Sequence, residues 1–258
     1  MTMTSESSIR DDTADRLIEA LNQDGFVLYQ QAIVPIRAAA RLPAYQEILI
    51  RFKEEEEKLL PPGTFIPILE SSCLMHILDR WVVNRVIKWI HAKRRTDPQW
   101  NAPCSSINLS TDSFTRPDFA GFVRQQLQKG RVSGRKFAFE IAEEDAHEHL
   151  DALSAVAGTL SAEGCGVALT GYSGELIAPE HLEVLRIDTV KLDIDIATTL
   201  DSDAKVYKRL SALQAKCEAQ GVRTVAEFVE KKSTLDKLKA LGVHYAQGYG
   251  IQMPAPLV

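Results

Sequence analysis

The chain has 258 residues, of which 45% are apolar and 25% are charged, so it can form one large domain or two small ones with a buried core. Its formal net charge of -5 argues against a nucleic-acid partner, which needs a concentrated basic surface. The four cysteines form no CxxC pair, which argues against a zinc site or a disulfide framework and fits a reduced compartment. No apolar run reaches the roughly 20 residues of a membrane span, and the polar first residues lack the apolar core of a signal peptide. We therefore expect a soluble, cytoplasmic protein.

Six stretches of the chain carry apolar residues at helical spacing. In the longest, Leu74, Ile77 and Leu78 begin a stripe that runs to about residue 90 and predicts an amphipathic helix. The six predicted helices span residues 11–23, 71–93, 116–129, 145–163, 203–219 and 231–241.

Short runs rich in Val, Ile, Phe and Leu lie between these helices and predict strands. The eight predicted strands span residues 26–36, 45–52, 104–110, 136–142, 166–170, 189–194, 222–227 and 243–247. From the third strand on, strands and helices mostly alternate, which indicates parallel strands joined by crossover helices. Eight strands without a Gly/Ser linker or an internal repeat favour an α/β fold, a TIM-like (β/α)8 barrel.

The beginning of the chain departs from a regular barrel. Only eight residues separate the first two predicted strands, which leaves no room for a long crossover helix, so this pair is expected to be antiparallel. We expect an N-terminal polar segment and helix over residues 1–21 and one barrel domain over residues 22–258. The acidic run at 54–58, EEEEK, is interpreted as a solvated loop or helix start without chemistry.

Polar side chains stand at the ends of several predicted strands. The C-terminal strand ends of such a barrel form one rim, where Glu47, Asn108, Glu140 and Glu227 would supply the hard oxygen ligands that suit Mg2+, Mn2+ or Ca2+. Lys191 lies at another strand end, where an ammonium group beside carboxylates can hold a water or a phosphate. Taken singly, each acid has an alternative interpretation as a surface or loop-anchoring residue.

One strand end differs from these, because GVALTGYSGE at 166–175 passes from an apolar run into Thr170 and Gly171 without a charged side chain. Glu175 is the first acid after the strand, and it lies several residues further on. This end of the rim is therefore predicted to lack the carboxylate chemistry of its neighbours.

The sequence resembles the EAL domain family of bacterial cyclic di-GMP signalling over residues 22–257. The matching segments are LYQQAIVPI (28–36), QEILIRF (46–52), LLPPGTFIPILE (59–70), LDRWVV (78–83), SSINLS (105–110), FEIAEE (139–144), IDTVKLD (187–193), TVAEFVE (224–230) and YAQGYGIQMPAP (245–256). The resemblance implies a barrel of the EAL type with one antiparallel strand. Active members hydrolyse cyclic di-GMP with two divalent metals that activate a water.

The resemblance also implies roles for individual residues. Its signature motif reads Glu47-Ile48-Leu49 here, and Glu47, Asn108 and Glu140 correspond to metal ligands. Glu227 corresponds to a ligand or base at the second metal, and Lys191 to the group that orients the water.

Further positions correspond to ligand contacts and supports of the site. Arg51 matches the arginine that contacts a substrate phosphate, while Leu49, Gln31 and Phe228 fall among the expected ligand-binding positions. The residues matched to support of the site or its loop are Glu143, Glu230 and Gln247, the last of which is also counted among the ligand contacts. Gln31 stands in YQQA, which departs from the tyrosine-glutamine-proline pattern usual in the family.

The paired aspartates of active members are missing. Counting back from Lys191 places them on Thr170 and Gly171, so the carboxylate that bridges the two metals is absent. Because a shared anion offsets much of the repulsion between two metal ions, we expect the remaining metal set to be weak or empty and hydrolysis to be absent or nearly so. A ligand-binding role would require no cofactor, and Mg2+ or Mn2+ would matter only for residual activity.

Three functions remain open at this point. Phe228 in TVAEFVE, together with LDRWVV, resembles the FimX type of degenerate EAL protein, which implies a cyclic di-GMP receptor with a PilZ-type or other signalling partner in motility or biofilm control. Phe228 would stack on a guanine in such a site, although a strand-end Phe is more often packed in a core. The alternatives are a nucleotide-independent interaction module and a weak metal-dependent phosphodiesterase. The family also suggests a homodimer.

Overall fold

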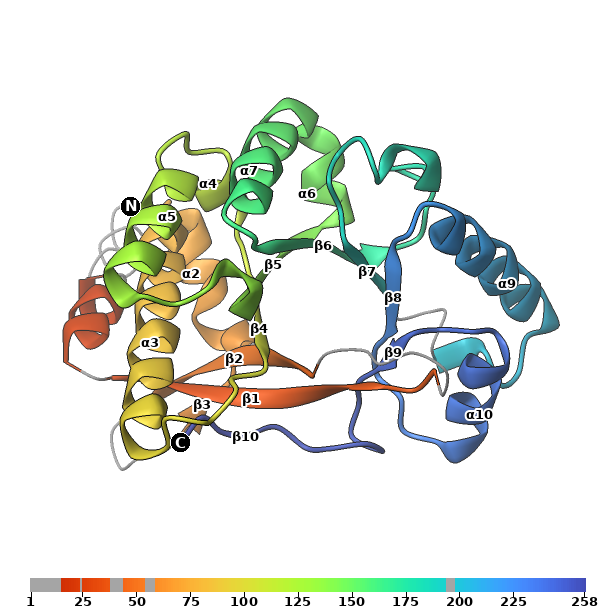
Figure 1. Cartoon of the computed structure of the whole chain (residues 1–258), viewed down its shortest axis with the longest axis horizontal. Coiled ribbons are helices and arrows are strands. Elements are labelled where there is room, and N and C mark those ends of the chain that lie inside the picture. The colour runs from red at the N-terminus through yellow and green to blue at the C-terminus, as the bar shows by residue number, and fades with distance from the viewer. Residues whose placement is uncertain (1–14, 24, 38–43, 54–58, 194–197) are drawn as a thin grey trace, which may run out of the picture.

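The strands close into a barrel with helices on its outside (Figure 1). The computed structural model describes residues 15–23, 25–37, 44–53, 59–193 and 198–258. The barrel strands, in order around the sheet, are β1 (Phe26–Pro35), β2 (Tyr45–Lys53), β4 (Cys104–Asn108), β5 (Phe137–Ala142), β6 (Gly166–Tyr172), β7 (Thr189–Leu192), β8 (Arg223–Ala226) and β9 (Tyr245–Ala246). Strand β1 pairs with both β2 and β9 and closes the ring.

The direction of the strands confirms the predicted fold. Strand β1 runs antiparallel to both of its barrel neighbours, whereas every other neighbouring pair in the barrel is parallel. The predicted TIM-like barrel with one antiparallel strand is therefore confirmed. The C-terminal ends of β2 and β4–β9 meet at one rim, as the sequence pattern required.

Two short strands were not predicted. Strand β3 (Leu59–Leu60) pairs with the end of β2, and β10 (Ala255–Pro256) pairs with β1 at Tyr29 and Gln30. A strand of two residues has no periodicity by which a sequence could reveal it.

The crossover helices cover the outside of the barrel, with α9 next to β7 and β8 and with α6 and α7 beside β5 and β6 (Figure 1). The helices are α2 (Ile66–Ser71), α3 (Met75–Thr96), α4 (Thr111–Phe114), α5 (Phe119–Gly130), α6 (Glu143–Glu148), α7 (Leu150–Ala162), α9 (Ala204–Ala219) and α10 (Lys232–Ala240), with single turns at Pro62–Thr64, Gly134–Lys136 and Pro179–His181. The predicted helix at 145–163 is two helices, because His149 leaves the helical region with φ -130° and ψ 44°.

Some predictions lie partly or wholly outside the described residues. The first predicted helix is described from residue 15, where it is helical to residue 22. The acidic run at 54–58 and most of the polar segment at 1–21 are not among the described residues, so the domain boundary stays a prediction. Within the described part of the chain, no helix combines the length and the apolar character needed to cross a bilayer.

Packing explains why the strands read as apolar runs. Phe137, Phe139 and Ile141 on β5 are each 0% exposed, because α5 and its neighbours cover one face of the strand while the barrel interior encloses the other. Helix α3 buries the predicted stripe through Leu78, Val82 and other apolar residues up to Ile90.

The β1–β2 pair extends past the barrel rim. Strand β4 pairs with β2 only as far as Ile48, so residues 49–52 of β2 continue past β4 with β1 as their partner. In this antiparallel register Gln31 lies opposite Glu47, and Tyr29 lies opposite Leu49. Residues at alternate positions share one face of the pair, which puts Glu47, Leu49 and Arg51 in a row above the barrel.

Candidate functional site

Three glutamates from three strand ends converge on one lysine at the upper rim. The Nζ atom of Lys191 lies 3.0 Å from Oε2 of Glu47, 2.9 Å from Oε2 of Glu140 and 2.9 Å from Oε1 of Glu227. Lys191 is 1% exposed, so these contacts replace its hydration. The structure therefore brings together the rim residues that the sequence singled out.

Neutral polar groups fix the same carboxylates. Asn108 donates its side-chain N–H to Oε1 of Glu47 at 2.9 Å, and Gln247 donates to Oε2 of Glu47 at 2.7 Å. Gln247 also donates to Oε1 of Gln31 at 3.0 Å, and the Gln31 amide donates to the carbonyl of Gln252. Ser106 donates its hydroxyl to Glu140. Gln247 thus links Glu47 to Gln31.

The charges of the cluster do not balance. Three carboxylates against one ammonium leave a formal charge of -2 if all are ionised. Burial raises the pKa of Glu140 to about 7, although Lys191 opposes that shift. Burial also raises the pKa of Glu227. Protonation of Glu140 near neutral pH therefore relieves part of the excess negative charge.

Lys191 and Glu47 keep their charges. Burial opposes the charge on Glu47, but the attraction of Lys191 and the hydrogen bonds from Gln247 and Asn108 outweigh it and hold the pKa of Glu47 below its ordinary value. Burial likewise opposes the ammonium charge, but the three carboxylates hold the pKa of Lys191 well above its ordinary range. Glu47 and Lys191 thus form the ionised pair at the centre of the cluster.

The C-terminal end of β6, which carries no charged side chain, lies beside this cluster. Thr170 and Gly171 line a pocket of about 330 Å3 together with Glu47, Asn108 and other members of the cluster. The register of β6 against β7 shifts between Leu169 and Tyr172, and Gly171 adopts a left-handed conformation with φ +61°. Glycine suits this irregular position, and no carboxylate stands there.

The side chains present do not fit a two-metal centre. Glu47, Glu140, Glu227 and Asn108 carry oxygen donors of the type that Mg2+ and Mn2+ prefer. Among the described residues, however, no three His, Cys, Asp or Glu side chains are arranged to hold one metal ion. The ammonium of Lys191 occupies the space between the carboxylates, and the end of β6 offers a hydroxyl in place of a bridging anion.

Glu175 lies away from the cluster. Its side chain is 71% exposed and pairs with Arg209 of α9 at 3.4 Å. Glu143 fixes the start of this loop, because its carboxylate accepts the N–H and hydroxyl of Ser173 and the N–H of Ile177 at 2.8–3.1 Å. Glu143 therefore anchors this loop, and Glu175 does not supply the missing carboxylate in this arrangement.

Three adjoining pockets form a cleft along the rim. The central pocket at Thr170 shares Glu47, Glu227 and Phe228 with a pocket of about 370 Å3 that reaches Arg51 and Tyr249. On its other side it shares Asn108, Glu140 and Thr170 with a more apolar pocket of about 290 Å3 between β2 and α3. Each pocket has the size of a small-molecule site, so the cleft suits an elongated ligand.

Exposed aromatic side chains flank the Arg51 end of the cleft. Phe228 is 53% exposed and has φ +56°, an outlier for a bulky residue, so this conformation is strained. Tyr249 is 60% exposed and lines the same pocket. Gly248 allows its loop to pack closely against Val229, because a Cβ at residue 248 would lie 2.3 Å from the Val229 backbone. Phe228 is thus not packed in the core, contrary to the more common role of a strand-end Phe.

Two groups in the cleft escaped the sequence analysis. Tyr249 lies in a loop, where no periodicity marks a function. Asp79 is 4% exposed in α3, where it accepts the N–H and the hydroxyl of Ser110 at 3.0 and 2.6 Å and lines the apolar pocket. Burial raises the pKa of Asp79. In the sequence, the available signal for Asp79 was the position of an acid within the apolar stripe of a predicted helix.

The family model described as "EAL domain" matches residues 14–254. The curated "Cyclic di-GMP phosphodiesterase PdeB" of Shewanella oneidensis is 30% identical over 244 residues, which cover 95% of this chain and 28% of that protein. "Cyclic di-GMP phosphodiesterase PdeF" of Escherichia coli is 27% identical over 244 residues, with 95% and 32% covered. The chain therefore spans about a third of the length of these relatives.

Two solved structures share the fold. The FimX EAL domain of Xanthomonas citri, in complex with c-diGMP, superposes with a TM-score of 0.88 and 24% identity over 98% of this chain and 97% of that one. The FimX EAL domain of Pseudomonas aeruginosa, bound to c-di-GMP, gives a TM-score of 0.83 and 24% identity, with 93% and 94% covered. At this identity the likeness establishes the barrel fold alone.

Proposed function

The chain belongs to the EAL domain family, and we propose that it binds cyclic di-GMP as a signalling receptor without hydrolysing it. The observation that carries the proposal is the contrast along one rim. Arg51, Phe228 and the three-part cleft remain, whereas Thr170 and Gly171 stand where a metal-bridging carboxylate is needed. Relatives of the chain are named cyclic di-GMP phosphodiesterases, and the two FimX domains of the same fold contain the nucleotide.

The phosphates would lie near Arg51. Arg51 lines the cleft, donates one N–H to the carbonyl of Ile50 and keeps further donors for a ligand. A charge-assisted hydrogen bond from a guanidinium to a phosphate contributes roughly 1.5–3 kcal/mol. Lys191 offsets the charge of Glu47, and the raised pKa of Glu140 lowers the repulsion between the cleft and a doubly charged ligand.

The two guanines would lie at the two ends of the cleft. At one end Phe228 and Tyr249 offer exposed ring faces, and stacking of a base on an aromatic side chain contributes about 1–3 kcal/mol. At the other end, the pocket beside α3 is lined mostly by apolar side chains. The carboxylates of Asp79 and Glu70 also line it. Carboxylate oxygens accept the N–H groups that guanine presents on its donor edge.

The loss of hydrolysis follows from the charges around the attacking water. In-line attack on phosphorus requires a hydroxide, and bulk water has a pKa near 15.7 without a metal to lower it. Thr170 offers a neutral hydroxyl and Gly171 no side chain, so the β6 end supplies no anion to hold two cations together. The receptor therefore needs no metal cofactor for binding.

Isothermal titration of cyclic di-GMP into the protein, first with EDTA and then with Mg2+, tests the proposal. We expect saturable binding in both buffers, and Arg51→Ala should weaken it about 10- to 100-fold. Arg95→Ala is the matched control, because Arg95 is an exposed arginine at the end of α3 and lines none of the cleft pockets. Absence of binding at tens of micromolar protein in either buffer would contradict the proposal and favour a nucleotide-independent interaction module.

The receptor would pass its signal to another protein in the cytoplasm. A PilZ-type partner, other signalling proteins and a homodimer are the predicted assemblies, and they stay predictions. Pull-down from cells with and without added cyclic di-GMP distinguishes a partner that depends on the nucleotide from one that does not.

A further inference from the structure

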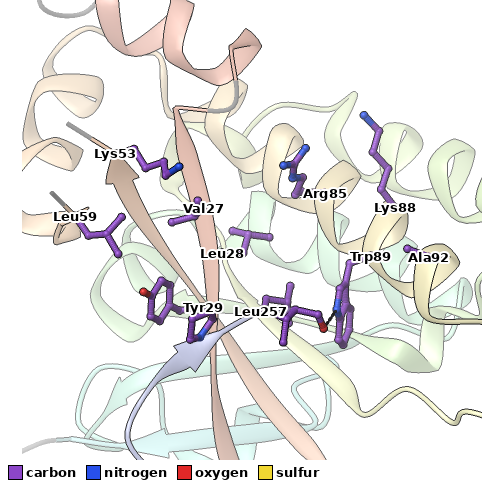
Figure 2. Close-up of a pocket in the computed structure, with 12 residues that line it drawn as sticks. Val27, Leu28, Tyr29, Lys53, Leu59, Arg85, Lys88, Trp89, Ala92 and Leu257 are labelled. Atoms are coloured by element: carbon purple, nitrogen blue, oxygen red, sulfur yellow. Dashed lines mark hydrogen bonds between the residues drawn. The ribbon is translucent and has the colours of Figure 1, made fainter. Parts of the chain in front are cut away.

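A second pocket lies outside the rim cleft, between strand β1 and helix α3. Its volume is about 580 Å3, larger than each of the three cleft pockets. Strand β1 carries Val27 and Tyr29. Lys53 and Leu59 lie on one side of it, and Arg85, Lys88 and Trp89 of helix α3 lie on the other side (Figure 2). Leu257 lies between the two aromatic rings.

Among the described residues, the side chains that line this pocket include three cations and no acid. Lys53 and Lys88 are exposed, and within the described part of the chain neither of them forms an ion pair. Arg85 and Lys88 stand three residues apart on α3, where like charges repel each other. This local excess of positive charge occurs in a chain whose net charge is -5. The two lysines, which have no ion-pair partner among the described residues, favour an anion.

The other walls of the pocket are aromatic and apolar. Tyr29 and Trp89 supply rings, and the indole N–H of Trp89 donates to a main-chain oxygen of Val258, the last residue, at 2.9 Å, which fixes the ring (Figure 2). Val27, Leu59 and Leu257 complete the apolar surface. Flat aromatic bodies bind on such walls, while phosphate oxygens bind to lysine and arginine.

The strand edge at this pocket is already taken. Strand β10 pairs with β1 at Tyr29 and Gln30, and the N–H of Leu257 donates to the carbonyl of Leu28 at 2.9 Å. An extended peptide therefore finds no free β1 edge at these positions, so the pocket fits a compact ligand better than an added strand.

We propose that this pocket binds a nucleoside phosphate, with its phosphates on Lys53, Arg85 and Lys88 and its base against the aromatic and apolar walls. The pocket adjoins the rim cleft, because Leu28 lines both this pocket and the one between β2 and α3, and the guanidinium of Arg51 lies 5.5 Å from the ring centre of Tyr29. The site is nevertheless separate from that cleft, since Arg51 does not line it.

Titration calorimetry with guanosine 5′-diphosphate, adenosine 5′-diphosphate and inorganic pyrophosphate, in buffer with EDTA, tests this site. Both nucleotides should bind in a one-to-one ratio, and pyrophosphate should bind at least about tenfold more weakly because it lacks the flat body. The double variant Lys53→Ala/Lys88→Ala should weaken nucleotide binding at least about tenfold. Lys129→Ala/Lys239→Ala removes two exposed lysines elsewhere and should leave it unchanged.

Arg51→Ala separates this site from the rim cleft. Nucleoside diphosphate binding should survive in Arg51→Ala, so failure of the proposed cyclic di-GMP function would leave this result unaffected. The proposal is overturned if no nucleotide binds at millimolar concentration, if the double lysine variant binds as tightly as the control, or if pyrophosphate binds as tightly as the nucleotides. Binding that is lost in Arg51→Ala would assign the nucleotide to the rim cleft and would also overturn it.

Discussion

Both ends of the barrel hold a cation among its strand residues, but the two cations have different surroundings. At the upper rim, Lys191 contacts three carboxylates beneath an open cleft. At the lower end, Arg223 donates to the hydroxyl of Tyr45 at 2.7 Å and lies 5.3 Å from the centre of its ring. Tyr45 in turn packs edge-on against Tyr245, and burial raises the pKa of Tyr45 to about 12.

The contrast separates a structural end from a functional end. Neutral phenols and a small apolar cluster of Ile33, Val225 and Tyr245 close the lower end. Between the two ends the barrel leaves a space of about 20 Å3, which is room for one water. A packed end gains stability from its polar contacts, whereas the upper end concentrates more negative charge than its one lysine neutralises. An excess of charge beneath a cleft is typical of a binding or catalytic site.

Removal of the two cations is expected to show the largest difference. Lys191→Met leaves three carboxylates without their shared cation and should lower the free energy of unfolding by about 3–5 kcal/mol. Arg223→Met removes a hydrogen bond to a neutral phenol and should cost about 1–3 kcal/mol. Urea unfolding measures both. Mn2+ should restore part of the stability of Lys191→Met and none of that of Arg223→Met. Equal losses in the two variants would contradict the assignment of different roles.

Return of the missing carboxylates should change metal binding at the upper end. Thr170→Asp/Gly171→Asp supplies the anions that the β6 end lacks, and a Cβ at Gly171 would have no neighbour within 4 Å. Asp tolerates the left-handed conformation of residue 171 better than most residues, so we expect a stability loss of about 1 kcal/mol. Calorimetric Mn2+ affinity should rise at least about tenfold. The control Thr170→Asn/Gly171→Asn adds similar volume without charge. An equal rise in both variants would exclude the missing charge as the cause.

Substitution of one aromatic residue at each end should change different properties: ligand affinity at the upper end and stability at the lower end. Phe228→Gly removes a ring from the cleft and relieves its positive φ, so cyclic di-GMP affinity should fall about 5- to 100-fold while stability is retained or rises by up to about 1 kcal/mol. Tyr45→Phe removes the hydrogen bond from Arg223 and keeps the ring, so it should lower stability by about 1 kcal/mol without changing affinity. Calorimetry and urea unfolding on the two variants measure this crossover. A loss of affinity in Tyr45→Phe would contradict it.

The smallest expected effect is a pH dependence of binding. The pKa of Glu140 is raised to about 7, so Glu140 is largely neutral at pH 6 and largely ionised at pH 8. Its negative charge then repels the phosphates, and affinity should fall about three- to tenfold between pH 6 and pH 8. None of the cleft pockets is lined by a histidine that would add its own transition. Glu140→Gln, neutral at both pH values, should flatten the profile. An affinity for cyclic di-GMP that rises with pH would contradict the expected repulsion between ionised Glu140 and the phosphates.

The barrel and its rim were predictable from the sequence because their signals are periodic. Apolar runs marked all eight barrel strands, and polar residues at the ends of those runs had to meet at one rim once the strands were parallel. Glu47, Glu140 and Glu227 followed from that rule, and so did the uncharged end at Thr170.

The remaining features depend on contacts that no local pattern encodes. The sequence did not reveal that Lys191 lies between the three glutamates, because these residues come from four different strands whose register no local pattern gives. Asp79 was hidden in a helical stripe, and Tyr249 in a loop. The left-handed backbone of Phe228 was equally hidden, because it arises where Gly248 packs against Val229.

One measurement decides between receptor and enzyme. The protein is incubated overnight with cyclic di-GMP and Mn2+, the complex is isolated by gel filtration, and the nucleotide it carries is identified by liquid chromatography. We predict that the protein carries intact cyclic di-GMP and that no linear dinucleotide forms. Linear dinucleotide that accumulates with the native chain and disappears in Glu47→Ala would show that the Thr170-Gly171 strand end still permits hydrolysis and would contradict the assignment as a receptor.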